Sequence, residues 1–350
     1  MNLTVKNHIL NLQNHLICDM IFNIQAANIK GEYILKKRFT ILIAAALTIM
    51  LSACGEIPIK FGTSPEGGTY GEVAKAIDSV SAENFEIRNT AGSAANVRLL
   101  SQGYLDMAIT QSDVLDNAYK GTGMFEGKQR TGYKAVAGLY TEACQVIVKA
   151  DSGINAIDEL TGKRVGIGEK ESGSEQNSKQ ILLAYGLTDN MLTEVNLNYV
   201  QECDQLKSGE IDAFFCTLAP SSPVLTKLAE ECDIKLLPID GRYAENLIKT
   251  YGFYTACKIP ANMYKGVSED VETIGVTAVL LASDYMPAQK VQAVTEAIFK
   301  NSDAINSAVS TDIHPNEQSA IKGISIPFHP GAAQYYKSHG ITVEQEEEQQ

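Results

Sequence analysis

The chain has 350 residues, of which 45% are hydrophobic, and a formal net charge of −13 at pH 7. This hydrophobic content is sufficient for one large domain or two of ordinary size, which argues against an extended disordered chain. The acidic balance repels the phosphate backbone of nucleic acid and anionic headgroups, so we expect no nucleic-acid partner.

An export signal is predicted near the N-terminus. The basic run 36–38 precedes the mostly apolar residues 39–51, a segment too short to span a bilayer. Its end, Leu51-Ser52-Ala53-Cys54, resembles the lipobox of bacterial lipoproteins, in which the cysteine is acylated and becomes the new N-terminus. We therefore expect removal of residues 1–53, an upstream extension with a signal peptide. Cys54 would then tether the exported chain to a bacterial membrane. A transmembrane anchor is the alternative.

Cleavage before Cys54 also changes the charge of the chain. It removes five basic and two acidic side chains, so the mature protein carries a formal charge of −16. The last residues, 344–350, contain only Glu and Gln, and this acidic tail is predicted to be disordered because it has no apolar side chain to bury.

Strand and helix patterns alternate along the mature chain, which favours an α/β architecture with largely parallel sheets. Strands are expected at 57–62, 85–88 and 107–110, and each leads directly into a helix. The helix after the first strand has apolar residues at the spacing i, i+3, i+4, i+7 from Tyr70.

The middle of the chain repeats this alternation. Apolar β-rich runs are expected at 135–139 and 144–148, and further strands at 164–168, 213–216 and 234–239, with helices between them. The remainder of the chain is expected to end in helices.

The cysteines give no metal pattern. Acylation of Cys54 leaves five cysteines, at spacings that contain no CxxC, so we expect no zinc site, no other metal and no cofactor. In an oxidising compartment an odd number suggests one or two disulfides and at least one free thiol. A bond between Cys144 and Cys257 is our first guess, because both lie in segments placed near the hinge of the molecule.

Glycine and hydroxyl residues gather where strands end and helices begin, at 67–69, 92–93 and 172–174. Helix N-termini direct unsatisfied N–H groups and a positive partial charge toward this edge of an α/β sheet, which predicts a site for a small anion. The alternative is helix capping, since Thr69 with Glu72 and Ser172 with Glu175 fit the capping box, and Ser93 is a good cap alone. Several junctions in two separate parts of the chain favour the shared site.

Catalytic motifs are missing. The histidines after Cys54 form no HExxH, the sequence contains no GxSxG, and we expect a protein that is not an enzyme. An enzyme on the same fold remains an alternative, and it would need an acid or base near the junctions, where the chain offers Glu66, Asp113, Glu142 and Glu171.

Several motifs together resemble the solute-binding receptors of the TAXI branch of tripartite ATP-independent periplasmic (TRAP) transporters. The resemblance covers nearly all of residues 57–341. The motifs that carry it are Gly62-Thr63 with Gly67-Gly68-Thr69-Tyr70, Gly92-Ser93 with Asn96, Gly103-Tyr104-Leu105-Asp106-Met107-Ala108-Ile109, Gln111-Ser112-Asp113, Gly209-Glu210-Ile211-Asp212-Ala213-Phe214-Phe215, Ile259-Pro260-Ala261-Asn262-Met263-Tyr264 and His329-Pro330-Gly331-Ala332.

The resemblance implies a type II periplasmic-binding-protein fold, in which two α/β lobes joined by crossing strands close on a solute. By this analogy, residues 54–143 with 255–343 form the first lobe and residues 144–254 the second. The family implies a monomer that captures glutamate or a related amino or dicarboxylic acid and delivers it to a TRAP membrane permease. An extracellular sensor or surface antigen module, with no permease partner, is a further alternative.

The ligand contacts carried over by the resemblance come from both lobes. Six are in the first lobe and four in the second, and they are Thr69, Tyr70, Ser93, Asn96, Gln111, Ser112, Ser172, Gly173, Ser174 and Thr217. Tyr70 lies on the apolar face of its predicted helix, so packing in the core is an alternative role for its ring.

Overall fold

A computed structural model describes residues 57–345 of the chain. The predicted signal peptide, the lipidation site at Cys54 and residues 346–350 of the acidic tail lie outside the described residues. Within residues 57–345, no helix has the length and apolar character needed to cross a membrane.

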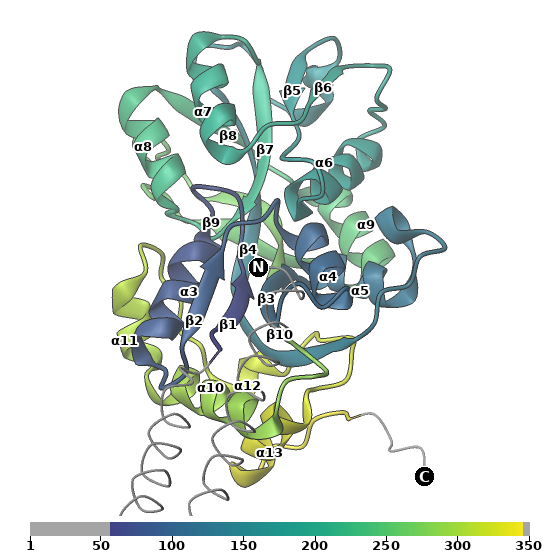
Figure 1. Cartoon of the computed structure of the whole chain (residues 1–350). Coiled ribbons are helices and arrows are strands. Elements are labelled where there is room, and N and C mark those ends of the chain that lie inside the picture. Colours follow the sequence, from purple (N-terminus) through teal and green to yellow (C-terminus); the bar gives the residue numbers. More distant parts are fainter. Residues whose placement is uncertain (1–56, 346–350) are drawn as a thin grey trace, which may run out of the picture. The chain divides into compact units, whose positions relative to one another are not determined.

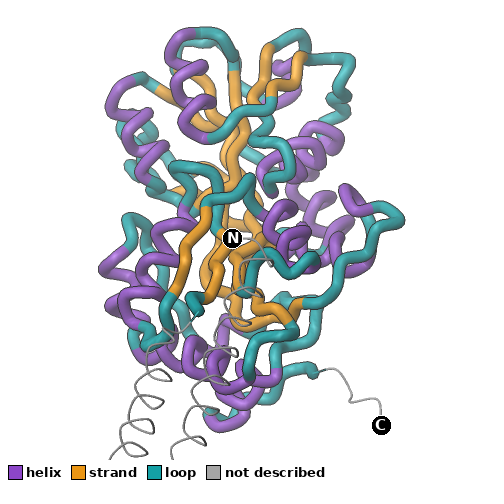
Figure 2. The backbone as a smooth tube through the Cα atoms, viewed as in Figure 1, coloured by secondary structure: helices purple, strands orange, loops and turns teal. Residues whose placement is uncertain are grey.

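Ten strands form one mixed sheet with helices packed on it (Figures 1 and 2). The strands are β1 (Ile59–Gly62), β2 (Phe85–Arg88), β3 (Met107–Gln111), β4 (Tyr133–Lys149), β5 (Arg164–Gly166), β6 (Thr193–Val195), β7 (Ala213–Leu218), β8 (Ile234–Leu237), β9 (Thr255–Ile259) and β10 (Val271–Ser283). The order along the sheet is β2-β1-β3-β10-β4-β7-β5-β6, with β8 beside β4 and β9 beside β10.

Helices follow most of the strands, as the alternating pattern predicts. They are α3 (Thr69–Val80), α4 (Ser93–Ser101), α5 (Ser112–Lys120), α6 (Gly173–Ala184), α7 (Tyr199–Ser208), α8 (Pro223–Glu231), α9 (Gly241–Tyr251), α10 (Ala288–Lys300), α11 (Ser302–Ala308), α12 (Glu317–Ala320) and α13 (Pro330–Ser338). The predicted strand-to-helix units at β1–α3, β2–α4 and β3–α5 are confirmed.

The centre of the sheet differs from the prediction. Strand β10 pairs antiparallel with both β3 and β4, and β4 pairs antiparallel with β7. Among the ten described strands, parallel pairing is confined to β1 with β2 and β3, and to β5 with β6 and β7. The predicted parallel arrangement is therefore confirmed at the two ends of the sheet and wrong in its middle.

The two predicted runs at 135–139 and 144–148 are parts of one strand, β4, which has 17 residues. The polar residues Thr141 and Glu142 interrupt the apolar pattern, but Glu142 is only 1% exposed, so the strand continues through them. Strand β10, of 13 residues, was not predicted. Together β4 and β10 extend through both halves of the molecule (Figure 1).

The buried apolar side chains form three clusters. The first, here called the core of the first lobe, takes its residues from 59–139 and 278–341. The other two, the cores of the second lobe, take theirs from 143–276. The predicted lobe boundaries stay a prediction, and the core packing favours a later second crossing, since Ile259 and Tyr264 pack with the second lobe.

Two local predictions need correction. Cys144 and Cys257 are free thiols, because they lie on β4 and β9 and strand β10 pairs with both, so the guessed disulfide is wrong. The tail does not lose its structure at residue 344, because the Glu344 carbonyl accepts a hydrogen bond of 2.8 Å from the Phe328 N–H.

Two glycine substitutions test the packing of the first lobe. A Cβ atom at Gly331, at the start of α13, would lie 2.1 Å from the Ala288 carbonyl oxygen of α10. We expect Gly331→Ala to lower the free energy of unfolding by roughly 1–3 kcal/mol, because the clash involves backbone that cannot turn aside. The measurement is urea unfolding followed by circular dichroism.

Gly71 provides the matched control. It lies within α3, and a Cβ atom there would meet nothing within 4 Å. Gly71→Ala is expected to raise stability by about 0.5–1 kcal/mol, because alanine restricts the unfolded chain and favours the helix. Equal effects of the two substitutions would contradict the described contact between α10 and α13.

Candidate functional site

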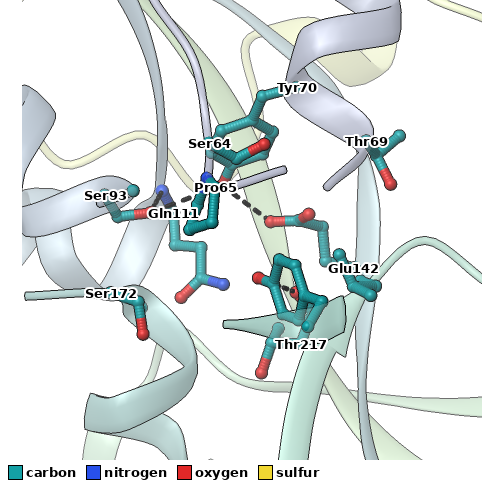
Figure 3. Close-up of a pocket in the computed structure, with 13 residues that line it drawn as sticks. Ser64, Pro65, Thr69, Tyr70, Ser93, Gln111, Glu142, Ser172 and Thr217 are labelled. Carbon is teal, nitrogen blue, oxygen red and sulfur yellow. Dashed lines mark hydrogen bonds between the residues drawn. The ribbon is translucent and has the colours of Figure 1, made fainter. Parts of the chain in front are cut away.

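A small polar cavity lies between the two lobes, where α3 and α4 of the first lobe face α6 of the second (Figure 3). It measures about 10 Å³, which is room for one water molecule. Its lining is formed by Ser64, Pro65, Thr69, Tyr70, Gly92, Ser93, Gln111, Glu142, Ser172, Gly173, Tyr199, Thr217 and Leu218. The two lobes are therefore closed on each other, and contribute residues to one shared site.

Seven of the ten predicted contact residues line this cavity. They are Thr69, Tyr70, Ser93, Gln111, Ser172, Gly173 and Thr217. The predicted contact set itself stays a prediction, because lining a cavity is not the same as binding a solute.

The other three predicted residues hold the backbone around the site. The Asn96 amide donates to the carbonyl oxygens of Thr63 and Ile109, at 2.6 and 2.7 Å. Ser112 Oγ accepts from the Thr277 N–H at 3.2 Å, and Ser174 Oγ accepts from the Thr217 N–H at 3.0 Å. These hydroxyl and amide groups hold together the loops and strands next to the cavity.

Helix capping explains only part of the hydroxyl pattern. Ser172 is the N-cap of α6, and its Oγ accepts from the Glu175 N–H at 3.0 Å. Thr69 and Ser93 are not caps, because α3 and α4 begin after Gly68 and Gly92 without a side-chain cap bond. Ser93 Oγ instead accepts from the Gln111 N–H at 3.1 Å.

Three buried polar atoms of the lining have no hydrogen-bond partner within the described chain. They are Ser64 Oγ, Thr69 Oγ1 and Gln111 Oε1. Each of these residues is 5% exposed or less. Buried polar groups are nearly always hydrogen-bonded in native proteins, so a group of three at one cavity indicates a site that a polar molecule completes.

Six lining residues were not assigned as contacts by the motif search, and Glu142 is the one of them that can ionise as a carboxyl. It lies in the middle of β4, opposite Val276 of β10, rather than at a strand-to-helix junction. Its Oε2 accepts a hydrogen bond of 2.7 Å from the Tyr70 hydroxyl. Tyr70 is at the same time part of the first-lobe core, so its ring packs in the core while its hydroxyl faces the site.

Burial controls the charge of Glu142. Removal from water raises the pKa of its carboxyl to about 8, against the smaller opposing effect of hydrogen bonds from Tyr70 and Gln111. None of the residues that line the cavity in the described chain is Lys, Arg or His. Glu142 is thus the one carboxyl group among the described lining residues, and no cationic side chain accompanies it there.

Direct contacts join the lobes beside the cavity. The N–H groups of Ala94 and Ala95, at the start of α4, donate to the Glu171 carbonyl oxygen of the second lobe at 3.2 and 3.3 Å. The Arg98 guanidinium pairs with the Glu171 carboxylate at 2.9 Å. The predicted anion-binding helix end at 92–93 is therefore occupied by the chain itself in the closed arrangement.

A second contact between the lobes is buried. Asp113 of α5 accepts hydrogen bonds from the amides of Gln176 and Asn177 on α6, at 2.7 and 2.8 Å. Burial raises the pKa of Asp113 to about 6, although these hydrogen bonds oppose the shift.

The alternative, an enzyme on the same fold, has few candidate catalytic groups in the cavity. Of the four acids considered for that role, Glu142 alone lines it. Among residues 57–345, no group of three or more His, Cys, Asp or Glu side chains is arranged to hold a metal ion.

Residues 61–340 match the model of the NMT1-like family. The chain belongs to the NMT1-like family. The finer prediction, the TAXI branch of the TRAP receptors, stays a prediction for this NMT1-like protein.

Solved structures show what the fold is similar to. PhnD1 from Prochlorococcus marinus, solved with methylphosphonate, superposes with a TM-score of 0.51 at 10% identity, over 81% of this chain and 98% of that one. A putative L-cystine ABC transporter protein from Listeria monocytogenes gives 0.46 at 16% identity, over 74% and 98%. The periplasmic aliphatic sulphonate binding protein SsuA from Escherichia coli gives 0.43 at 13%, over 81% and 79%. The predicted two-lobed periplasmic-binding-protein fold is confirmed.

Stability should fall as pH rises, because the buried carboxyls hold protons in the folded state that they lose when unfolded. For Glu142 the folded pKa is about 8 and the unfolded value about 4.5, so its contribution is complete below pH 4.5 and is lost as pH rises through 8. We expect up to roughly 4 kcal/mol of loss from this residue. Urea unfolding between pH 5 and 8.5 measures it.

Glu142→Gln identifies the source of that loss. The amide cannot ionise, so the variant should lose less stability than the native chain over the same pH range. An unchanged pH dependence in the variant would contradict the protonation assigned to Glu142.

Proposed function

We propose that this NMT1-like protein is an extracytoplasmic solute-binding receptor. The observation that carries the proposal is the cavity between the lobes, with three unpartnered buried polar atoms and lining residues from both lobes. These groups are placed to hydrogen-bond a small polar molecule from several sides.

Binding requires the lobes to move. A cavity of about 10 Å³ does not hold a molecule the size of an amino acid, so the solute enters when the lobes separate. Closure then exchanges the hydration of the polar lining for hydrogen bonds to the solute. The solute shifts the population toward a closed state because it contacts both lobes only there.

The solute we propose is a small carboxylate such as glutamate or a related acid. The helices α3 and α6 each begin at a lining residue, Thr69 and Gly173, and a carboxylate is stabilised at such helix ends. Each hydrogen bond to a charged group contributes about 1.5–3 kcal/mol, so a few of them support micromolar affinity.

The proposed partner is a TRAP permease, and the proposed attachment is a lipid anchor at Cys54. Both rest on the sequence motifs. A TRAP permease does not use ATP, so uptake of the solute by cells that carry this chain should continue when ATP is depleted and the ion gradient is maintained. Uptake that stops on ATP depletion would rule this partner out.

Thr69→Val tests the binding site. Thr69 Oγ1 has no partner in the described chain, so its loss should leave the melting temperature nearly unchanged. If the hydroxyl binds the solute, affinity should fall by roughly tenfold, equivalent to about 1.4 kcal/mol. Isothermal titration calorimetry with glutamate and related acids measures the affinity of both chains.

Ser174→Ala is the matched control. Ser174 does not line the cavity, and its hydroxyl accepts from the Thr217 N–H, so the variant should lose roughly 1–3 kcal/mol of stability and retain more affinity than Thr69→Val. If Ser174→Ala lost more affinity than Thr69→Val, the result would contradict the proposed binding site. A lowered melting temperature for Thr69→Val would indicate a structural role for Thr69.

A further inference from the structure

We propose that Glu142 recognises a cationic nitrogen of the solute, so that the receptor selects molecules that carry an ammonium group over dicarboxylates of the same size. This inference rests on the proposed function and specifies the chemistry of the same site. Its evidence is the charge balance and the hydrogen-bonding capacity of the cavity lining.

The charge balance opposes a purely anionic solute. Glu142 is 1% exposed, and no Lys, Arg or His of the described chain lines the cavity with it. A buried carboxylate without a cation is strongly unfavourable, and a second carboxylate placed beside it adds repulsion. The Tyr70 hydroxyl donates to Glu142 at 2.7 Å but carries no charge. A solute cation would supply the missing charge.

The unpartnered atoms of the lining fit an ammonium group. An ammonium has three donors and no acceptor, and it needs oxygen atoms on several sides. Gln111 Oε1 is a buried acceptor without a partner, and the Ser64 and Thr69 hydroxyls can also accept. A charged Glu142 adds the negative charge that an ammonium group requires. The lining therefore offers more acceptors than its own donors use.

The carboxylate end of the solute also has a place in the cavity, at the starts of two helices. Helices α3 and α6, of 12 residues each, start at the cavity from opposite lobes. Their N-terminal N–H groups favour a carboxylate. An amino acid has both a cation and an anion at short separation, whereas a dicarboxylate has no group that matches Glu142.

Protons provide a signature of this recognition. Six titratable groups of the surrounding elements interact with Glu142. They are Tyr70 on α3, Tyr140 and Cys144 on β4, Asp113 on α5, Tyr199 on α7 and Cys216 on β7. All of them are neutral or acidic. Since burial raises the pKa of Glu142 to about 8, the carboxyl is mostly protonated at pH 7 in the closed arrangement unless a cation is placed beside it.

The sign of the proton exchange distinguishes the two kinds of solute. An ammonium stabilises the carboxylate form, so binding at pH 7 releases a proton from Glu142, and affinity rises from pH 6 to 8. A dicarboxylate favours the protonated form, so its affinity falls as pH rises through 8 and its binding takes up protons.

The experiment uses isothermal titration calorimetry on the purified full chain with matched pairs of probes: glutamate with 2-oxoglutarate, aspartate with oxaloacetate, and alanine with pyruvate. The two members of a pair differ by the replacement of the ammonium with a carbonyl. Titrations in buffers of different ionisation enthalpy give the number of protons exchanged. We expect an amino acid to bind at least tenfold more tightly than its 2-oxo partner, with proton release at pH 7.

Two variants assign the effect to Glu142. Glu142→Gln should abolish the proton release and reduce the preference for the ammonium member by about tenfold or more. Glu202→Gln is the control, because Glu202 is equally buried in the second lobe and lies outside the cavity lining. This variant should prefer the ammonium member of each pair as strongly as the native chain does. Circular dichroism confirms that both variants are folded.

The outcomes separate this inference from the proposed function. Equal or tighter binding of the 2-oxo acids, or an unchanged preference in folded Glu142→Gln, would overturn the inference and leave the receptor function standing. If the chain bound tightly only a solute without a cationic nitrogen, such as methylphosphonate, the inference would also be overturned and the receptor function would stand. If no solute of either kind bound, the proposed function and the inference would both be wrong.

Discussion

The antiparallel pairing of β4 with β10 is the constraint on which the rest of the structure depends. These two strands are shared by both lobes, and the packed cores lie on either side of the point where they cross from one lobe to the other. Because the shared strands fix where the lobes meet, the starts of α3, α4 and α6 face one another across a single narrow space. The cleft is therefore a consequence of the topology, and its chemistry depends on which residues the sequence places there.

The sequence places a carboxyl group at that point and no cation with it. Glu142 lies on one of the shared strands, fully buried, and accepts a hydrogen bond of 2.7 Å from Tyr70. The closed arrangement satisfies the backbone well, for example through the Glu171 carbonyl at the start of α4, but it leaves several side-chain oxygen atoms of the lining without partners. The closed protein is therefore well packed and yet incomplete in hydrogen bonding, which is the condition in which a polar solute adds stability to closure.

Local patterns predicted the outer parts of the fold and much of the site. The units β1–α3, β2–α4 and β3–α5 are defined by short-range periodicity, and the glycine and hydroxyl junctions that follow them do reach the cavity. The antiparallel centre was not predicted, because pairing of β3, β10 and β4 joins residues far apart in the sequence and leaves no local signal. Asn96 and Ser174 have the expected residue types but bond to backbone. Glu142 was considered only as a possible catalytic acid near the junctions and was missed as a contact, because it lies in mid-strand.

In the proposed function the two lobes open, and a bound solute closes them. A distance measurement between spin labels tests it directly, with one label at Lys75 on α3 and one at Lys227 on α8, both exposed, and with Cys232 and Cys257 replaced by serine. We expect a broad distribution of distances without solute and a narrow one, matching the closed arrangement, when a binding solute is added. An identical distribution with and without a solute that calorimetry shows to bind would contradict it.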